Sequence, residues 1–560
     1  MTIGNCSRKD STVTLGLFAH LIFNRFEPAN LSVLACLLGL VPSLLSILFL
    51  VHLAIFKALA FAFLTYYATL ALSIVVYRLS PFHPLSNIPG PIPNKISMLW
   101  MLWIGLQKKR HVYIKQLHDK YGDIVRIGPN EVSIRDPSAI TPLMGANGWP
   151  KGPNWTGRTL NNPTASLIAI RDPALHNRRR RPWTRALNTA SVKEFQPLIA
   201  KRVKQLVDRL EQQSSSKEID LSQWISYFTY DFMGDMAFGH WSEMLDEGDK
   251  DQLWQILKGA LKTMSFLEPI PWLAQFILMI PNAGEGMKHM RKFNLARMQD
   301  RMHSDVKRKD LFYYIHNEDG AEPQQPPIAQ LLADANLAII AGSDTTSTTL
   351  SNIFFSLLRN PGVYKKLQAE VDQWYPQGSD ATDPEHHQDM SYLDAVINET
   401  LRLFPVVPSG SQRAAVRGSG GKFIGPYYLP EGTQARIHFW SIQRDPRNFF
   451  PKSDTFWPER WLIAQGDMPA PDDFRHNFDA FIPFSFGSYN CVGKNLALTE
   501  MRTVLCHVLQ NLSFRFVDGW DADEWERGLE DNFVIDHGAL PVTVTVRSSS
   551  RAEDSGYMSR

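Results

Sequence analysis

The chain has 560 residues, more than one compact core usually accommodates, so we expect one large domain with an appendage or two domains. Apolar residues make up 44% and charged residues 20%, which excludes a disordered or low-complexity chain. Lys and Arg number 58 against 56 Asp and Glu, so we expect no nucleic-acid partner. Four cysteines without a CxxC pair exclude a disulfide framework and the usual structural zinc sites, and they favour a reducing compartment for the main domain.

An apolar segment near the N-terminus predicts a membrane anchor. Residues 31–56 contain no Asp, Glu, Lys or Arg, and a second uncharged segment covers residues 58–77. As helices these segments would reach about 39 and about 30 Å, enough to cross a bilayer. We expect either a hairpin of two spans with its turn at Lys57, or one span and one buried or interfacial helix.

The flanks of this segment predict its topology. Basic residues lie on both sides of it, so the positive-inside rule predicts that both ends of a hairpin face the cytoplasm. The late start, the length and the missing small-residue exit site argue against a cleaved signal peptide. Five prolines and one glycine then predict a stiff, extended connector over residues 80–93.

The whole chain is therefore predicted to have five parts. Helix-period segments dominate the main domain, with strand-like runs at residues 123–134 and 540–546. The parts are an N-terminal segment (1–30), the membrane anchor (31–77), the Pro-rich connector (78–93), the main domain (94–546) and a disordered tail (547–560).

A cysteine in a glycine-containing loop is the strongest chemical signal. Residues 484–493 read FSFGSYNCVG and precede an amphipathic helix pattern that begins at Lys494. The helix dipole and free backbone N–H groups favour a thiolate at Cys491, and Gly487 and Gly493 allow the backbone to pass close to a flat, bulky ligand. This arrangement suits a sulfur ligand to haem iron. The alternative for Cys491 alone is a buried structural cysteine.

This run, with Phe484, Gly487, Cys491 and Gly493 at fixed spacing, resembles the haem-binding loop of the cytochrome P-450 family, the haem-thiolate monooxygenases. Three further segments agree in order. Residues 341–346, AGSDTT, resemble the oxygen-activating motif of the long central helix, Glu399-Thr-Leu-Arg402 resembles the ExxR motif, and residues 456–461, FWPERW, resemble the PERF segment. The resemblance covers nearly all of residues 85–546.

The resemblance implies a mainly α fold with small β-sheets (α+β). In this cytochrome P-450 fold, a triangular helical domain holds haem between the long central helix and the cysteine-bearing helix. An N-terminal transmembrane anchor precedes it, as in the microsomal enzymes of fungi. The implied cofactor is haem b, with Cys491 as the axial ligand of its iron.

The central motif has an unusual composition for a helix. A glycine costs about 1 kcal/mol in a helix, and the threonines after Gly342 lower the helix propensity further. By resemblance, Gly342 opens room over the haem face, Thr345 donates a hydrogen bond to dioxygen, and Asp344 connects the site to solvent for proton delivery. The alternative is a Ser/Thr-rich helix packed in a core.

Further roles follow from the resemblance. Glu399 and Arg402 alone would be an ordinary i,i+3 ion pair, but with Arg460 they imply a buried network that holds the haem-binding core together. The implied partners of the haem propionates are His176, Arg180 and Arg413. The family usually has a basic residue two positions before the cysteine, where this chain has Tyr489. One propionate contact is then weakened, made by the phenol or moved to another side chain.

The implied reaction needs electrons from NADPH through NADPH-cytochrome P-450 reductase, with cytochrome b5 as a second donor. Lys494 and the cluster Arg178, Arg179, Arg181 and Arg185 are candidates for docking an acidic flavoprotein, or the cluster is a solvated basic face. The resemblance places the anchor in the endoplasmic reticulum membrane and the catalytic domain in the cytoplasm.

The implied substrate is a lipophilic small molecule, such as a terpenoid or another secondary metabolite, that is hydroxylated or epoxidised. Two alternatives are a haem-thiolate isomerase or dehydratase that needs no external oxygen, which Asp344 and Thr345 argue against, and a haem-binding membrane protein without turnover. By resemblance the pocket is lined by mostly apolar side chains, namely Trp155, Leu160, Leu167, Ile168, Leu337, Ile340, Ala341, Val406, Val407, Ser409, Phe533, Val534 and Ile535.

Overall fold

The computed structural model describes residues 3–28, 30–158, 164–240, 242–273, 276, 280, 285–304, 309–416 and 418–547. Leu160 and nearly all of the predicted tail lie outside these residues. The chain divides into two compact units. The first comprises Met1–Met101 and Val125–Val132, and the second Leu102–Ile124 and Ser133–Arg560.

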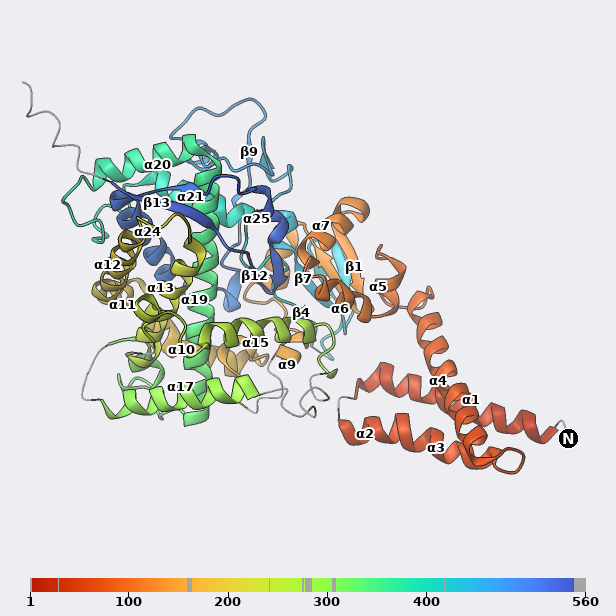
Figure 1. Cartoon of the computed structure of the whole chain (residues 1–560). Helices are drawn as coiled ribbons and strands as arrows, with labels where there is room; N and C mark the ends of the chain where they lie inside the picture. The colour runs from red at the N-terminus through yellow and green to blue at the C-terminus, as the bar shows by residue number, and fades with distance from the viewer. Residues whose placement is uncertain are drawn as a thin grey trace, which may run out of the picture. The chain divides into compact units, whose positions relative to one another are not determined.

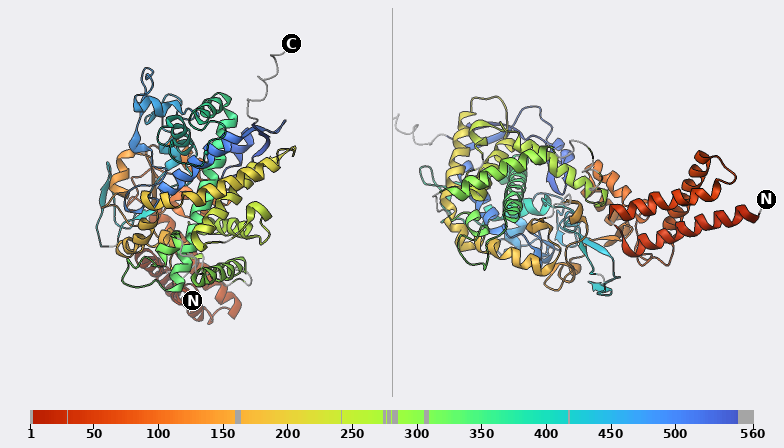
Figure 2. Two further views of the ribbon diagram at one scale, coloured as in Figure 1. Left: turned by 90° about the vertical axis from the view of Figure 1, so that its left-hand side faces the viewer. Right: turned by 90° about the horizontal axis from the view of Figure 1, so that it is seen from below.

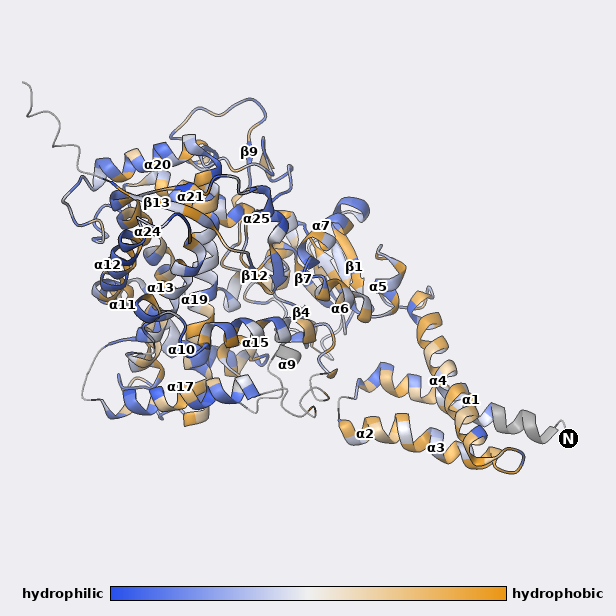
Figure 3. Cartoon of the chain, viewed as in Figure 1, coloured by the Kyte–Doolittle hydropathy of each residue, from blue (hydrophilic) through white to orange (hydrophobic). Residues whose placement is uncertain are grey.

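Apolar helices form most of the first unit (Figures 1 and 3). Two helical segments are long and apolar enough to cross a membrane, Leu31–Phe49 with 19 residues and Ile55–Leu79 with 25 residues, which fits a membrane anchor. The first segment consists of α2 (Leu31–Ala35), a π-helical turn (Cys36–Leu40), α3 (Val41–Ser46) and a 3-10 turn (Ile47–Phe49). The second segment is α4 (Ile55–Leu79), and α1 (Ile3–Phe26) precedes both.

The helices of this unit pack on α4. Ala19 of α1 and Ala62 of α4 are buried in a shared apolar cluster, and the hydroxyl of Tyr66 donates to the backbone carbonyl of Leu37 at 2.8 Å. The break between the two long segments lies at residues 50–54, so the predicted turn at Lys57 is wrong: Lys57 lies in the first turn of α4. Residues 50–54 carry no Asp, Glu, Lys or Arg, so the charge pattern gave no signal there.

The second unit is mainly helical, with small sheets, as the resemblance implies. Its long helix α19 (Ile328–Arg359) runs through the middle of the domain and contacts helices on several sides (Figures 1 and 2). Among the described residues, the other α-helices of the domain are α7 (Arg110–Tyr121), α8 (Ile140–Met144), α9 (Asn154–Arg158), α10 (Pro173–Ala186), α11 (Thr189–Glu194), α12 (Gln196–Gln212), α13 (Leu221–Phe238), α14 (Met244–Glu247), α15 (Leu253–Leu267), α17 (Glu285–His303), α18 (Leu311–Ile315), α20 (Pro361–Trp374), α21 (Ser391–Leu403), α22 (Phe439–Ile442), α23 (Glu459–Gln465), α24 (Lys494–Asn511) and α25 (Asp523–Gly528). The predicted connector is shorter and less extended than expected, because α4 runs to Leu79, residues 81–87 form turns and α5 (Ile92–Ile96) begins before residue 93; α6 (Leu99–Leu106) follows.

The strands are short, and the antiparallel pairs form small sheets. The strand-like run at 123–134 forms β1 (Ile124–Gly128) and β2 (Glu131–Ile134), and the run at 540–546 forms β13 (Pro541–Val546), which pairs with β10 (Leu512–Phe516) and β3 (Ile219–Asp220). The pair β11 (Glu530–Asn532) and β12 (Val534–Asp536) forms a hairpin with Phe533 at its tip. The remaining strands are β4 (Arg413–Ala414), β5 (Lys422–Ile424), β6 (Tyr427–Leu429), β7 (Gln434–Ile437), β8 (Phe449–Phe450) and β9 (Arg475–His476).

Helix α19 stays continuous through its glycine and threonines although their helix propensity is low. The hydroxyls of Thr345 and Thr349 donate to the carbonyls of Ala341 and Thr345, four residues earlier, at 2.6 and 2.8 Å. Packing against α13 supplies the stabilisation, since a Cβ at Gly342 would lie 2.6 Å from the sulfur of Met233. The expectation that Gly342 opens room over a haem is therefore wrong, because α13 fills that space.

Candidate functional site

The cysteine loop connects a short 3-10 turn, Gly487–Tyr489, to the start of α24. The backbone N–H of Cys491 donates to the carbonyl of Phe484 at 2.8 Å, which closes the loop. Desolvation by neighbouring protein atoms raises the pKa of the Cys491 thiol, although the residue retains exposed surface, while the N–H of Gly493 and the charges of Arg180 and Lys494 oppose this effect. Without a bound metal ion, the protein therefore favours the protonated thiol of Cys491, whereas the sequence predicts a thiolate. A metal ion at the sulfur would displace the proton.

The two glycines of the loop have different environments. Gly487 has φ +71°, and a Cβ there would lie 2.0 Å from the carbonyl oxygen of Met144 in α8. The approach of α8 and the positive φ thus both require glycine at 487, and the expected approach of the loop to a flat ligand stays a prediction. At Gly493 the nearest atom to an added Cβ is the sulfur of Cys491 at 3.9 Å, so this glycine keeps the space beside the sulfur open.

Basic side chains from separate segments surround the ring of Tyr489. The guanidinium of Arg413 lies 4.5 Å from the ring centroid and the ammonium of Lys151 lies 4.9 Å from it, while the ring of His176 lies 4.3 Å away. Arg180 donates to the backbone and side-chain oxygens of Asn490 at 2.7 and 2.6 Å. The structure thus brings the predicted His176, Arg180 and Arg413 together next to the cysteine loop.

Arg413 tests whether these residues fit haem. Its side chain is completely buried, and within the described part of the chain none of its three nitrogens has a hydrogen-bond partner. Burial lowers its pKa to about 10, and no carboxylate contributes to the shift. A buried guanidinium without a counterion is energetically unfavourable, so an anion bound beside Arg413 would stabilise the site. Two carboxylates on a flat macrocycle, with iron beside the Cys491 sulfur, match this set of groups.

The predicted ionic network forms around Glu399. Its carboxylate accepts from Arg402 at 2.8 and 2.9 Å and from Arg460 at 3.0 Å, and all three side chains have no exposed surface. The backbone N–H of Trp457 and the indole of Trp461 also donate to it, at 2.9 and 3.1 Å. The carboxylate therefore joins α21 to α23 and the segment before it.

The central motif orients its two functional groups differently. Asp344 is buried and accepts from the hydroxyl of Tyr230 in α13 at 2.7 Å, and burial raises its pKa to about 6. Thr345 is only partly buried, and its hydroxyl donates to the carbonyl of Ala341. Sequence reasoning missed Tyr230, because nothing in a mostly apolar helix marks which tyrosine faces a carboxylate.

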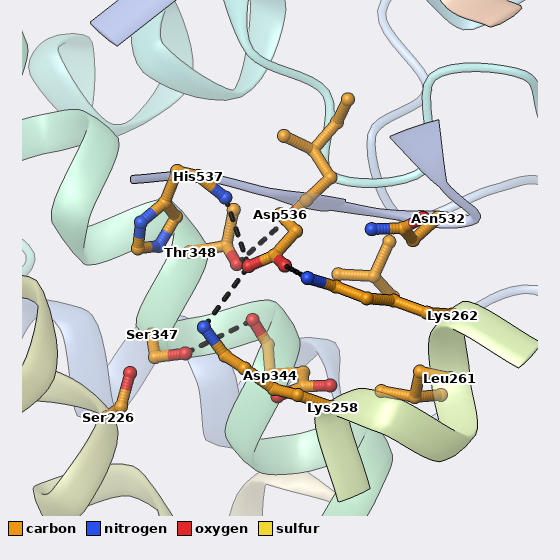
Figure 4. A pocket seen from close by; sticks show the side chains of 12 residues that line it. Ser226, Lys258, Leu261, Lys262, Asp344, Ser347, Thr348, Asn532, Asp536 and His537 are labelled. Atoms are coloured by element: carbon orange, nitrogen blue, oxygen red, sulfur yellow. Dashed lines mark hydrogen bonds and ion pairs between the residues drawn. The ribbon is translucent and has the colours of Figure 1, made fainter. Parts of the chain in front are cut away.

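Asp344 lies at a polar pocket between α19, α15 and β12 (Figure 4). Two lysines of α15 point at Asp536 of β12: the Lys258 ammonium lies 3.1 Å from one carboxylate oxygen, and that of Lys262 lies 3.2 Å from the other. The positive charge of Lys258 also lowers the pKa of Asp344, against the larger effect of burial. Lys258, Lys262 and Asp536 therefore line the same pocket as Asp344, and the two lysines lie on its α15 side.

The expected substrate-contacting segments converge in part. The rings of Trp155 and Phe533 meet edge to face, 5.5 Å between centroids, and the N–H of Ile535 donates to the carbonyl of Val406 at 2.9 Å. Phe533 has φ +78°, which is strained for a bulky residue. Ser409 instead donates its hydroxyl to the carboxylate of Asp531, at 2.8 Å. The β11–β12 tip, α9 and the segment after α21 are thus close together.

Helix α10 has fewer free arginines than its sequence suggests. Arg179 pairs with Asp334 of α19 at 2.7 Å and is almost buried, and Arg185 pairs with Asp319 at 2.8 Å and with Glu322 at 2.5 Å. Arg178 and Arg181 are exposed, as is Lys494. Arg179 and Arg185, two of the four arginines in the cluster, therefore form ion pairs within the fold.

Known proteins are similar to this chain over most of its length. The family model of cytochrome P450 matches residues 89–532, and the chain belongs to this family. It is 34% identical over 485 residues to the cytochrome P450 monooxygenase FCK2 of Fusarium pseudograminearum, covering 86% of this chain and 85% of that protein. It is also 30% identical to the tryprostatin B 6-hydroxylase of Aspergillus fumigatus, over 86% and 84% of the two chains. Similarity to the trichothecene C-15 hydroxylase of Fusarium sporotrichioides is 32%, over 80% and 90%.

Family membership defines the class of reaction. The protein is a monooxygenase that uses haem b, receives electrons from a redox-partner reductase, typically from NADPH, and acts on a lipophilic small molecule. Its apolar N-terminal helices fit a membrane anchor.

Proposed function

We propose that the chain hydroxylates a lipophilic secondary metabolite, with Cys491 as the axial ligand of the haem iron. The observation that carries this proposal is the cysteine loop with its neighbouring buried, unpaired Arg413. Bound haem supplies the activation of dioxygen, and a thiolate ligand favours cleavage of the O–O bond. The protein residues hold the cofactor, deliver protons and orient the substrate.

Arg413, Arg180 and His176 hold the propionates in this account. Burial and the nearby charge of Lys151 lower the pKa of His176 to about 4, so its imidazole is neutral at physiological pH and acts as an N–H donor, not as a cation. Arg180 is already fixed by Asn490, next to the cysteine. Phe484, Gly487 and Gly493 shape the loop, and Glu399, Arg402 and Arg460 secure the core behind it.

Asp344 and Thr345 deliver protons in this account. A carboxyl group with a pKa of about 6 exchanges protons near neutral pH, and the hydrogen bond from Tyr230 holds it in place. Asp536, Lys258 and Lys262 at the pocket of Figure 4 provide the polar path that connects Asp344 to solvent. The Thr345 hydroxyl can turn from its own helix to a ligand, because it is partly exposed.

The substrate class rests on the wall residues and on the relatives. Trp155, Phe533 and the neighbouring aliphatic side chains offer apolar contacts, which favour a polycyclic or prenylated molecule over a charged one. Relatives named as hydroxylases of tryprostatin B and of a trichothecene support an alkaloid or terpenoid substrate. Hydroxylation of a C–H bond is therefore the reaction that we favour.

In this proposal the anchor lies in the endoplasmic reticulum membrane and the catalytic domain faces the cytoplasm. Arg25, Arg78 and Lys95 flank the two long apolar segments, which supports this orientation by the positive-inside rule. Arg178, Arg181 and Lys494 form the basic docking surface for the reductase, and cytochrome b5 is a second donor to the same surface.

The test is consumption of NADPH by the full-length protein with reductase, in a screen of lipophilic alkaloids and terpenoids. We expect a substrate that shifts the haem spectrum, stimulates NADPH consumption and gains one oxygen atom. Thr345→Ala should keep this binding but release peroxide in place of product. Thr349→Ala is the matched control, because Thr349 makes the same bond one turn later in the helix. Product formed without NADPH and oxygen would support an isomerase and overturn the proposal.

A further inference from the structure

Lys151 is a cation beside Tyr489 that is not among the predicted partners of the haem propionates. Lys151 is buried, with 5% of its surface exposed, and lies in the segment before α9. Its ammonium donates to the carbonyls of Ile168 and Leu167 at 2.6 and 3.3 Å, and its backbone pairs with that of Arg413 through an isolated β-bridge. Lys151 and Arg413 are thus fixed side by side.

The charges near Lys151 are unbalanced. The groups whose charge acts on its ammonium are Arg413 and Arg180, both positive, and with burial they lower its pKa well below the usual value. Backbone carbonyls satisfy hydrogen bonds but do not neutralise charge. Arg413 and Arg180 both repel Lys151, and in the described part of the chain no carboxylate is among the charges that act on Lys151 or Arg413, so an anion bound among them would offset this cost.

Tyr489 explains how the cluster is arranged. Both Lys151 and Arg413 lie over its ring, at 4.9 and 4.5 Å from the centroid, and an aromatic face attracts cations without neutralising them. In the described part of the chain its hydroxyl has no hydrogen-bond partner. The ring therefore attracts both cations close to the cysteine loop, at a position where the loop itself carries no charge.

We infer that Lys151 is a further residue that binds a haem propionate, supplying together with Arg413 the positive charge that the loop lacks at Tyr489. This inference rests on the proposed haem site and assigns the missing contact to a side chain 338 positions earlier in the chain. The alternative is that Lys151 only ties the chain to the carbonyls of residues 167 and 168.

The test measures the rate of haem transfer from the holoenzyme to excess apomyoglobin. Lys151→Met should accelerate haem loss at least ~10-fold, the order expected for losing one charge-assisted hydrogen bond, whereas Lys151→Arg should stay within about threefold. Lys422→Met is the matched control, because Lys422 also donates to two backbone carbonyls, those of Pro142 and Asn147, at 3.1 and 2.6 Å. It should leave the rate unchanged.

Two further measurements separate charge from packing. Tyr489→Arg restores a charge in the loop, so it should slow haem loss again in the Lys151→Met background. The reduction potential of haem should become more negative in Lys151→Met but not in Lys422→Met, because a lost positive charge disfavours the reduced iron. Unchanged haem loss in Lys151→Met, or faster loss that Tyr489→Arg does not reverse, would overturn the inference. A wild-type protein without a thiolate-ligated haem would instead overturn the proposed function.

Discussion

Glu399 is the carboxylate that pairs with the two completely buried arginines Arg402 and Arg460. Arg402 and Arg460 lower its pKa although burial acts in the opposite direction, so the group is ionised in the fold. Its five donors come from α21, α23 and the segment before α23. An ion pair of this kind adds little over an apolar core, but the loss of one partner leaves a buried uncompensated charge.

Glu399→Gln should therefore lower the free energy of unfolding by about 3–5 kcal/mol, because Arg402 and Arg460 lose their counterion. Thermal unfolding of the holoenzyme measures the change. Asp394→Asn on the same helix is the control: Asp394 pairs with Arg502 at 2.7 Å, but both side chains are partly exposed, so the loss should be below about 1 kcal/mol. Equal effects of the two substitutions would contradict the buried network.

The pKa of Asp344 shifts in the opposite direction to that of Glu399, because burial raises it from 3.8 to about 6. The folded protein then holds this proton more tightly than the unfolded chain does. The stabilising contribution is complete below about pH 4 and is lost as the pH rises through about 6. At neutral pH the ionised carboxylate of Asp344 therefore lowers the free energy of unfolding by roughly 3 kcal/mol. Its role in carrying protons explains why a destabilising carboxylate occupies this position.

Asp344→Asn should accordingly stabilise the protein, since an amide still accepts the bond from Tyr230 without a buried charge. We expect a gain of up to roughly 3 kcal/mol above pH 7 that shrinks to zero near pH 4. Urea unfolding of both proteins from pH 4 to pH 8 measures it. A difference that does not vary with pH would show that the carboxylate titrates normally in the fold.

At the scale of elements, α13 and α19 form the centre of the domain. Their contact includes the hydrogen bond from Tyr230 to Asp344, and the hydroxyl of Ser343 donates to the carbonyl of Thr229 at 3.1 Å. Met233 occupies the place where Gly342 lacks a side chain. The poor helix composition of residues 342–349 is thus the result of close packing to one neighbouring helix, and the same packing positions the proton-carrying acid.

Gly342→Ala should lower stability by about 1–2 kcal/mol, because the overlap with Met233 outweighs the gain in helix propensity. In a Met233→Ala background the same substitution should be neutral or stabilising. Gly259→Ala in α15 is the control: no atom outside its own helix lies within 4 Å of its added Cβ, so it should stabilise by about 0.5–1 kcal/mol. Additive effects in the double-mutant cycle would contradict the contact.

The elements also show where sequence reasoning succeeds. The apolar period of residues 494–511 and the alternation at 540–546 depend on local pattern, and both elements form with nearly the predicted bounds. The predicted position of the anchor's turn was wrong because it was assigned to Lys57, the one charged residue between the two apolar segments. A break between two helices does not require a charged residue. Residues 342–349 have low helix propensity and still lie within α19, as expected, because tertiary packing on α13 outweighs propensity.

At the scale of the whole molecule, the motif residues could be predicted and their surroundings could not. Cys491, Glu399 and Arg402 lie in short patterns with fixed spacing, so one sequence is enough to find them. The partners Lys151 of Tyr489, Tyr230 of Asp344 and Asp334 of Arg179 are all distant in sequence, and only the fold brings them together. Arg179 and Arg185 show the same limit, since their acidic partners could not be read from a basic run.

The central claim is that Cys491 ligates a haem through its sulfur and that the catalytic domain is built around that bond. The most direct measurement is the carbon-monoxide difference spectrum of the reduced full-length protein and of its Cys491→Ser variant. We predict the red-shifted Soret band of a thiolate-ligated haem in the wild type and its complete loss in the variant. A histidine-type Soret band in the wild type, or a thiolate-type band that persists in Cys491→Ser, would contradict the account.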